Sequence, residues 1–291
     1  MNMSFAIVTD TGANLPEEMI EKNELLVLSL SFFVDDQEYY SYEPGKKTDL
    51  ANFYKMMREK KPIRTSLVNE ELAKEQIAAL LADGKDVLYI GFSSGLSGTF
   101  QSVSIAMDAL KEEYPDRKIL AVDTLAAALG QGLLVYFAIE KRREGVQIEE
   151  VYRWILENRL HLCHWFTVDD LLFLKRGGRI SAATAVVGTA LNIKPILHVD
   201  DEGHLINMAK ARGRKKSLDA LLKKFEECAI NPGETPVFIS HGDCIEDVQY
   251  VEQKLKEKYG VKEVVIQILD PVIGAHAGPG TVALFFFGTH R

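Results

Sequence analysis

The chain has 291 residues and a formal net charge of −8 at pH 7, and its apolar and charged fractions are ordinary for a globular protein. This length suits one large domain or two of moderate size, and the negative charge argues against general nucleic-acid binding. Three widely spaced cysteines without a C-x-x-C pair indicate reduced thiols. With no signal-peptide pattern and no apolar run of membrane-spanning length, we expect a cytoplasmic protein without a transmembrane segment.

Apolar runs and helical spacings alternate through the first 160 residues. Short apolar runs predict buried strands, and longer stretches with one apolar face predict helices. The expected strands are 5–8, 25–33, 87–90 and 118–122, and the expected helices are 49–59, 126–143 and 146–160. This alternation favours an N-terminal α/β/α domain with a mainly parallel sheet.

After about residue 160 the pattern changes, and strands become more frequent than helices. The expected strands are 164–168, 196–199, 205–208, 237–241, 264–269 and 281–287, and the clearest helix is 246–259. Asp200 to Gly203 reads as the turn of a hairpin between the second and third of these strands. We therefore predict two α/β domains, 1–160 and 161–291.

The stretch from Val87 to Gln101, VLYIGFSSGLSGTFQ, has the pattern of a strand, a glycine-rich turn and the start of a helix. Such a turn directs backbone N–H groups outward, and the helix dipole adds positive potential there. The hydroxyls of Ser93, Ser94, Ser97 and Thr99 add further hydrogen-bond donors. The stretch predicts either a site for a carboxylate or phosphate, or an ordinary strand-to-helix loop with a serine cap.

Two other hypotheses concern the same region. Gly91 to Gly95 fits G-x-S-x-G, the nucleophile elbow of serine hydrolases, and a triad of Ser93, Asp270 and His276 would follow the order of that fold. Thr65-Ser66 precedes a helical pattern, and by itself this position favours a helix cap.

Other common motifs are missing from the sequence. It contains no G-x-x-x-x-G-K-[ST] and no G-x-G-x-x-G, so neither nucleotide fingerprint applies. No His, Cys, Asp and Glu cluster has metal-ligand spacing, so we expect no metal site. Two basic segments, 175–179 and 212–216, are either solvated loops or contacts for a phosphate or an acidic partner.

Taken together and in order, several segments resemble the DegV family, whose characterised members are fatty-acid-binding (FakB) subunits of bacterial fatty acid kinase. The resemblance covers nearly the whole chain. The segments that carry it are 9–16 (TDTGANLP), Thr65-Ser66, 93–101 (SSGLSGTFQ), 169–181 (DDLLFLKRGGRIS), 194–197 (KPIL), 210–213 (KARG) and 274–280 (GAHAGPG). Two departures are Thr11 in place of a serine and Leu67-Val68 in place of Gln-Pro after Thr65-Ser66.

The resemblance implies a two-domain DegV-like fold with a long-chain fatty acid in an apolar tunnel between the domains. It implies that the carboxylate is held by the positions that match the family's motifs, which are Thr65, Ser94, Ser97, Gly98 and His276. No cofactor is implied other than the fatty acid itself as ligand. Hydroxyls, N–H groups and an imidazole can offset the cost of burying a carboxylate.

The resemblance also implies a partner, a DAK-type kinase that uses ATP to phosphorylate the bound carboxylate to acyl phosphate for phospholipid metabolism. Arg176, Arg179 and Arg212 would face this kinase or the new phosphate. On this interpretation the chain is a carrier that presents its substrate and is not an enzyme by itself.

Overall fold

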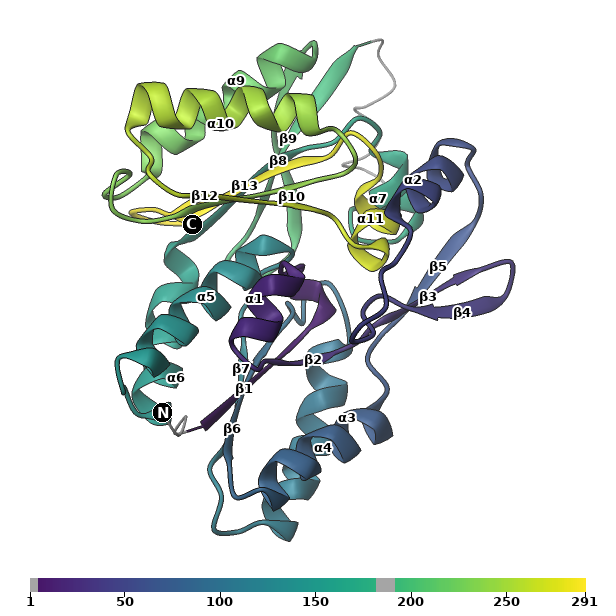
Figure 1. Cartoon of the computed structure of the whole chain (residues 1–291). Coiled ribbons are helices and arrows are strands. Elements are labelled where there is room, and N and C mark those ends of the chain that lie inside the picture. Colours follow the sequence, from purple (N-terminus) through teal and green to yellow (C-terminus); the bar gives the residue numbers. More distant parts are fainter. Residues whose placement is uncertain (1–4, 182–191) are drawn as a thin grey trace. The chain divides into compact units, whose positions relative to one another are not determined.

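The computed structural model describes residues 5–181 and 192–291 (Figure 1). Internal contacts divide the chain into two compact units. The first comprises Met1–Thr48 and Arg64–Arg159, and the second comprises Asp49–Ile63 and Leu160–Arg291. Each unit is built around its own sheet.

The main sheet of the first unit has four strands in the order β2-β1-β6-β7, and all neighbours are parallel. These strands are β1 (Phe5–Asp10), β2 (Leu26–Leu28), β6 (Asp86–Gly91) and β7 (Ile119–Asp123). A parallel sheet needs cover on both faces. Helices α3 (Glu70–Ala82) and α4 (Thr99–Glu113) pack together on one side, and α5 (Leu129–Arg143) and α6 (Ile148–Asn158) pack together on the other (Figure 1). The short α1 (Glu17–Lys22) follows β1. The α/β/α architecture expected for this part is confirmed.

A smaller sheet of the first unit has the order β4-β3-β5. Its strands are β3 (Ser31–Val34), β4 (Gln37–Tyr40) and β5 (Ile63–Ser66). The single run expected at 25–33 is therefore two strands, β2 and β3. Asp35 and Asp36 form the turn after β3 with φ of 50° and 61°, as a tight hairpin requires.

Thr65 lies in strand β5, and the hypothesis that Thr65-Ser66 caps the next helix is wrong. Asn69 caps α3 instead, because its side chain accepts a 2.9 Å hydrogen bond from the N–H of Leu72. An asparagine is as effective a cap as a serine or threonine, so α3 needs no cap from Thr65-Ser66.

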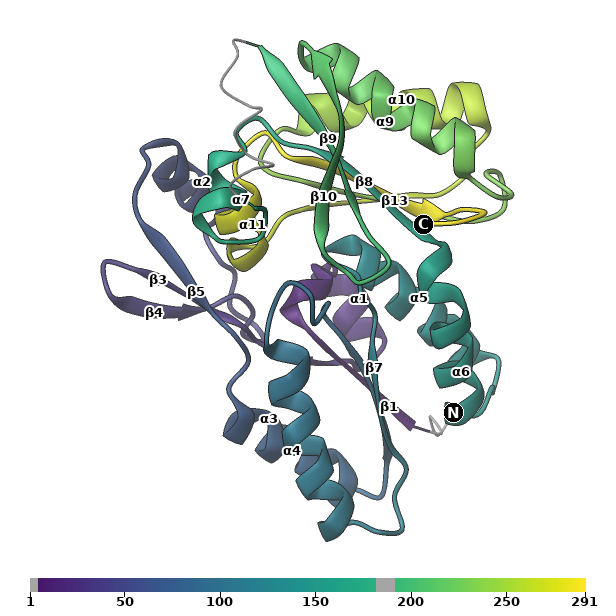
Figure 2. The same ribbon diagram turned by 180° about the vertical axis from the view of Figure 1, so that it is seen from behind.

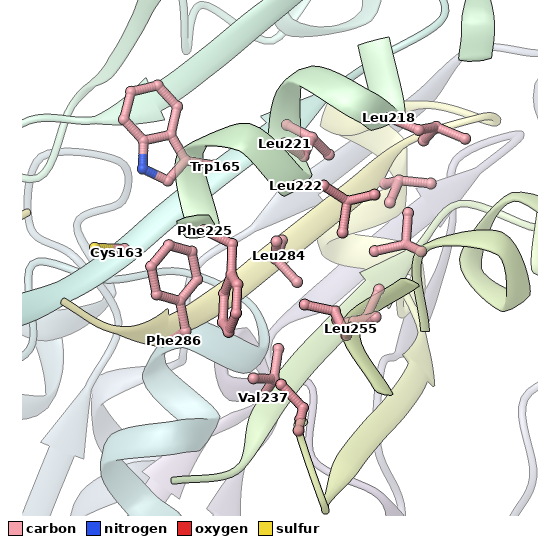
Figure 3. Packing of buried hydrophobic residues seen from close by; sticks show 14 of the residues in the cluster. Cys163, Trp165, Leu218, Leu221, Leu222, Phe225, Val237, Leu255, Leu284 and Phe286 are labelled. Atoms are coloured by element: carbon pink, nitrogen blue, oxygen red, sulfur yellow. The ribbon is translucent and has the colours of Figure 1, made fainter. Parts of the chain in front are cut away.

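The sheet of the second unit has six strands in the order β10-β9-β8-β13-β11-β12. These are β8 (Leu162–Thr167), β9 (Ile193–Val199), β10 (Leu205–Arg212), β11 (Val237–His241), β12 (Val264–Ile268) and β13 (Val282–Phe287). All neighbours are antiparallel except β11 and β12, which are parallel. Helices α9 (Arg214–Cys228) and α10 (Ile245–Tyr259) cover one face, where Phe225, Leu284 and Phe286 belong to a continuous apolar core (Figure 3).

The described part of the second unit also contains the short helices α2 (Leu50–Arg58), α7 (Leu172–Arg176) and α11 (Pro271–Ala277). The sequence assigns α2 to the first domain, whereas its side chains contact the second unit. The hydroxyl of the buried Tyr54 donates to the carbonyl oxygen of Leu269 at 3.0 Å, and Arg58 pairs with Asp243 at 2.6 Å. The local sequence of α2 predicts only an amphipathic helix. The unit against which this helix packs is decided by its contacts with residues far away in the sequence.

The described helices include none that is both long enough and apolar enough to cross a lipid bilayer.

Candidate functional site

The serine-rich loop, defined as residues 92–98, leaves the carboxyl end of β6 and leads into α4. Because β1, β6 and β7 are parallel neighbours, their carboxyl ends meet at one edge of the sheet. The register pairs Thr9 with Ile90 and Gly91 with Asp123, so the residues that follow β1 and β7 flank the loop. This edge is where open α/β sheets commonly bind their ligands.

Asp10, at the end of β1, supports the serine-rich loop from a fully buried position. Its carboxylate accepts hydrogen bonds from the hydroxyl of Tyr89 at 2.7 Å and from the N–H groups of Gly12 and Phe92 at 2.9 and 3.0 Å. Burial raises the pKa of Asp10, and these hydrogen bonds oppose that rise. The carboxylate is therefore satisfied within the protein and fixes where the loop begins.

Asp123, at the end of β7, holds the middle of the loop. Its carboxylate accepts from the N–H of Leu125 at 2.9 Å and more weakly from the N–H of Ser94 at 3.3 Å. The N–H of Ser94 therefore points toward the Asp123 carboxylate, which leaves the hydroxyl as the group of Ser94 that could bind an external anion. The Ser94 hydroxyl stays on the exposed side of the loop.

The donors of the loop gather at its end, where α4 begins. The hydroxyl of Ser97 lies 2.9 Å from that of the buried Thr99 and accepts from the Thr99 N–H at 3.2 Å. In the described part of the chain, no acceptor is assigned to the N–H groups of Gly98, Phe100 and Gln101. These groups belong to the first turn of a helix, where the peptide dipoles favour a negative charge. The prediction of an anion cradle at this end of the loop is consistent with this geometry.

The Thr65-Ser66 segment lies next to this cradle within the first unit. A β-carbon built on Gly98 would lie 3.3 Å from Cδ2 of Leu67, and the Ser102 hydroxyl donates to the carbonyl oxygen of Val68 at 2.9 Å. The segment after Thr65 therefore runs along the start of α4. Leu67-Val68, one of the two departures from the family pattern, contacts the cradle directly.

In the second unit, α7 and α11 pack together, and His276 lies close to Arg179, one of the predicted arginines. His276 lies in the last turn of α11, and its ring packs against Gly177, at the end of α7. Burial, followed by the positive charge of Arg179, lowers the pKa of His276 to about 4. A neutral imidazole at pH 7 has one N–H to donate and one nitrogen to accept.

The three predicted arginines have different surroundings. Arg179 is half-buried and donates to the carbonyl oxygen of Gly177, and its pKa is lowered by burial. Arg176 is exposed, and its guanidinium lies 4.7 Å from the centre of the Phe173 ring. Arg212 is exposed at the end of β10, where it pairs with Ile193 of β9. Arg176 and Arg212 are therefore available to a partner, whereas Arg179 belongs to the surroundings of His276.

The nucleophile-elbow hypothesis finds little support in the geometry. Ser93 is fully buried, its hydroxyl accepts from the N–H of Gly95 at 3.2 Å, and α4 begins six residues later instead of directly after it. An elbow instead exposes its serine on a strained turn, and Ser93 is absent from the non-glycine residues with positive φ. Asp270 caps α11 through the N–H of Ile273 at 2.9 Å.

Three residues that shape the site were not identified from the sequence: Tyr89, Asp123 and Gly177. A pairing of the parallel strands would have placed Asp123 beside Gly91, but Tyr89 and Gly177 carry no local signal of their roles. Within the described residues, no group of three or more His, Cys, Asp and Glu side chains could hold a metal ion.

The chain is similar to a family whose relatives include fatty-acid-binding proteins. The profile of the DegV family, described as a family of uncharacterised proteins, matches residues 4–289. A DegV domain-containing protein of Clostridium perfringens is 46% identical over 284 residues, which cover 98% of this chain and 97% of that protein.

Among solved structures, a DegV family protein from Thermus thermophilus, described as fatty acid binding, has a TM-score of 0.87 at 30% identity. The match covers 98% of this chain and 100% of that one. DegV from Bacillus subtilis, described as a fatty acid binding protein, has a TM-score of 0.84 at 28% identity, with 98% and 99% of the two chains covered. Because the family profile and the Clostridium perfringens relative both match nearly the whole chain, the chain belongs to the DegV family.

Proposed function

We propose that this protein binds a long-chain fatty acid and holds its carboxylate with Thr65, Ser94, Ser97, Gly98 and His276. The observation that carries the proposal is the cradle at the start of α4. There, N–H groups that have no acceptor among the described residues and the Ser97 hydroxyl lie close to strand β5, which contains Thr65. The relatives described as fatty acid binding support the choice of ligand.

The energetics of such a ligand match the chemistry of the cradle. An ionised carboxylate that is buried away from water needs a full set of hydrogen bonds. The N–H groups of a helix N-terminus and side-chain hydroxyls can donate them, and hydrogen bonds to a charged group are stronger than those to a neutral one. The neutral His276 adds a donor without adding a second full charge. The acyl tail supplies affinity at roughly 0.8 kcal/mol for each buried methylene, which explains why a long chain is needed.

The test begins with the protein purified from a bacterial host. Solvent extraction and mass spectrometry should release about one fatty acid per chain, and delipidated protein should take up oleate or palmitate. Thr65→Ala, Ser97→Ala and His276→Ala should each weaken binding roughly tenfold to hundredfold, because each removes a hydrogen bond to a charged group.

Matched controls remove the same kinds of group from exposed positions. Ser66→Ala changes a neighbouring hydroxyl on the exposed side of β5, and His204→Ala removes an exposed imidazole from the β9–β10 turn, so both should bind as the wild type does. Absence of any bound lipid, together with no uptake of added fatty acid, would refute the proposal. Labelling of Ser93 by a fluorophosphonate, with ester turnover that depends on His276, would favour a serine hydrolase instead.

A finer part of the proposal concerns a DAK-type kinase that phosphorylates the bound carboxylate. Exposed arginines on an acidic protein steer anionic partners and suit a phosphate, and Arg176 and Arg212 have this exposure. Arg179 lies beside His276, so in this proposal it would stabilise the negative charge of the carboxylate or of the new phosphate. In this scheme the protein presents its substrate and the kinase performs the chemistry.

The kinase role has its own test. Arg176→Ala and Arg212→Ala should leave fatty acid binding unchanged and reduce acyl phosphate formation in an assay with ATP and a fatty acid kinase. Arg153→Ala, which removes an exposed arginine from α6, should leave both unchanged. Equal acyl phosphate formation by all three variants would rule out these arginines as the docking residues.

A further inference from the structure

Positions 177 and 178, at the end of α7, are both glycine but for different reasons. Gly178 has φ of +72° and no heavy atom within 4 Å of a built β-carbon, so it is required by its left-handed backbone. Gly177 has φ of −72° and ψ of −9°, an ordinary helical conformation that any residue adopts. Backbone geometry therefore does not explain Gly177.

What Gly177 provides is room for the ring of His276. A β-carbon at Gly177 would lie well under 3.0 Å from Nδ1 of His276 and 2.9 Å from Cε1. Real β-carbons do not approach other atoms so closely, so a side chain at this position and the present ring position exclude each other.

The two backbones around this contact have little freedom to move apart. Helices α7 and α11 lie side by side in both views (Figure 1 and Figure 2). A β-carbon at Gly278 would lie 2.5 Å from the ring of Phe173, and one at Gly280 would overlap the carboxylate of Asp169. Asp169 is itself held by Lys194 at 2.6 Å.

The opposite side of α11 is equally close to its neighbour. A β-carbon at Gly274 would lie 2.8 Å from the hydroxyl of Tyr54. Since α11 is enclosed between α7 and α2, a methyl group at Gly177 would be accommodated by rotation of the His276 side chain and not by separation of the helices.

We infer that Gly177 is the positioning residue for His276: by lacking a side chain, it sets where the imidazole lies for the carboxylate of the ligand. This inference rests on the proposed function in one respect, that His276 contacts the carboxylate. Gly177 itself touches no ligand and acts only through the histidine.

The test is a double-mutant cycle on fatty acid binding. Gly177→Ala should weaken binding about as much as His276→Ala, roughly tenfold to hundredfold, because both remove the correctly placed imidazole. Gly177→Ala in the His276→Ala background should cause no further loss, since no ring remains to be displaced. Gly178→Asn, which tolerates a left-handed backbone, is the control and should bind as the wild type does.

A second readout does not depend on the ligand. In the NMR titration of the delipidated protein, the His276 pKa should rise from about 4 toward 6.5 in Gly177→Ala, as the ring leaves its buried place beside Arg179. In Gly178→Asn it should stay where the wild type has it. If Gly177→Ala fails to fold while the double variant folds, removal of the His276 ring has relieved the overlap, and this result confirms that the methyl group collides with the ring.

The outcomes separate the inference from the proposed function. Wild-type binding by His276→Ala would refute the role of His276 in the function, whereas a shifted His276 titration in Gly177→Ala would still support the positioning. An unshifted titration and unchanged binding in Gly177→Ala would overturn the inference. Failure of both Gly177→Ala and the double variant to fold would also overturn it, because the glycine would then serve the backbone.

Discussion

The hydroxyl of Tyr89 donates a 2.7 Å hydrogen bond to the carboxylate of Asp10, and both residues are completely buried. The same carboxylate holds the N–H of Phe92, the first residue of the serine-rich loop. The serine-rich loop, which is proposed to bind the carboxylate of a ligand, is therefore held in place by the carboxylate of Asp10. A buried charge of this kind is stable only while its hydrogen bonds are complete.

Removing the Tyr89 hydroxyl should therefore destabilise the protein and disturb the loop. We expect Tyr89→Phe to lower the free energy of unfolding by about 1.5–3 kcal/mol, because the buried Asp10 carboxylate loses one of its hydrogen bonds. Urea denaturation measures this change. Tyr40→Phe, which removes a hydroxyl from a tyrosine that is 39% exposed, should change stability by less than about 0.5 kcal/mol. Equal stability of the two variants would show that the hydrogen bond contributes nothing.

The carboxylate of Asp123 should weaken the binding of an anion at the cradle. A carboxylate oxygen of Asp123 lies 3.3 Å from the backbone nitrogen of Ser94. It adds negative charge to the loop, and it accepts the hydrogen bond that the Ser94 N–H could otherwise donate to a ligand. We expect Asp123→Asn to bind fatty acid a few-fold more tightly, since about 1 kcal/mol of repulsion between like charges is removed. Isothermal titration with oleate tests this, with Asp108→Asn on the exposed side of α4 as the charge-matched control. Weaker binding by Asp123→Asn would mean that the loop needs this carboxylate for its shape.

Acid should destabilise the protein through its buried histidines. Burial lowers the pKa values of His164, His198, His241 and His276 below the 6.5 of an exposed imidazole. Between pH 6.5 and the lowered value, the unfolded chain binds a proton that the folded protein does not, so stability falls as the pH falls. For His276, with its pKa of about 4, the full effect is roughly 3 kcal/mol.

The measurement is the free energy of unfolding from pH 7 to pH 4.5. Its slope should be smaller in His276→Asn than in the wild type by about 1.4 kcal/mol per pH unit, which corresponds to one proton. His204→Asn, at an exposed position, should keep the wild-type slope. Parallel curves for all three proteins would show that His276 titrates normally in the folded state.

The three cysteines should resist alkylation in the folded protein. All three are free thiols, and burial raises the pKa values of Cys163 and Cys244 to about 12 and also raises that of Cys228. The thiolate is the reactive form, so iodoacetamide at pH 8 should label none of them until the protein is unfolded in urea. Intact-mass spectrometry counts the labels. Rapid modification of Cys244 without urea would show that its surroundings open in solution.

Much of the secondary structure follows from the sequence because the apolar patterns are local. The runs that become β1, β6 and β13 are strands with every apolar residue buried, and the helical spacing of α2 and α4 is correctly assigned. Boundaries are less predictable where two signals compete. Gly274 to Ala277 belongs to α11, although the three glycines between 274 and 280 suggest a loop, because Asp270 caps the helix and Gly274 allows Tyr54 to pack closely against it.

The spacing of hydroxyls and glycines before a helix identifies the serine-rich loop in the sequence, and the resemblance to the DegV family supplies the set of residues proposed to bind the carboxylate. The sequence does not decide which N–H groups of the loop are already used. That depends on Asp10 and Asp123, which are 82 and 29 residues away from their loop partners, Phe92 and Ser94. Likewise, only the tertiary structure shows that Gly177 leaves room for His276, since the absence of a side chain has meaning only beside the atoms that would collide with it.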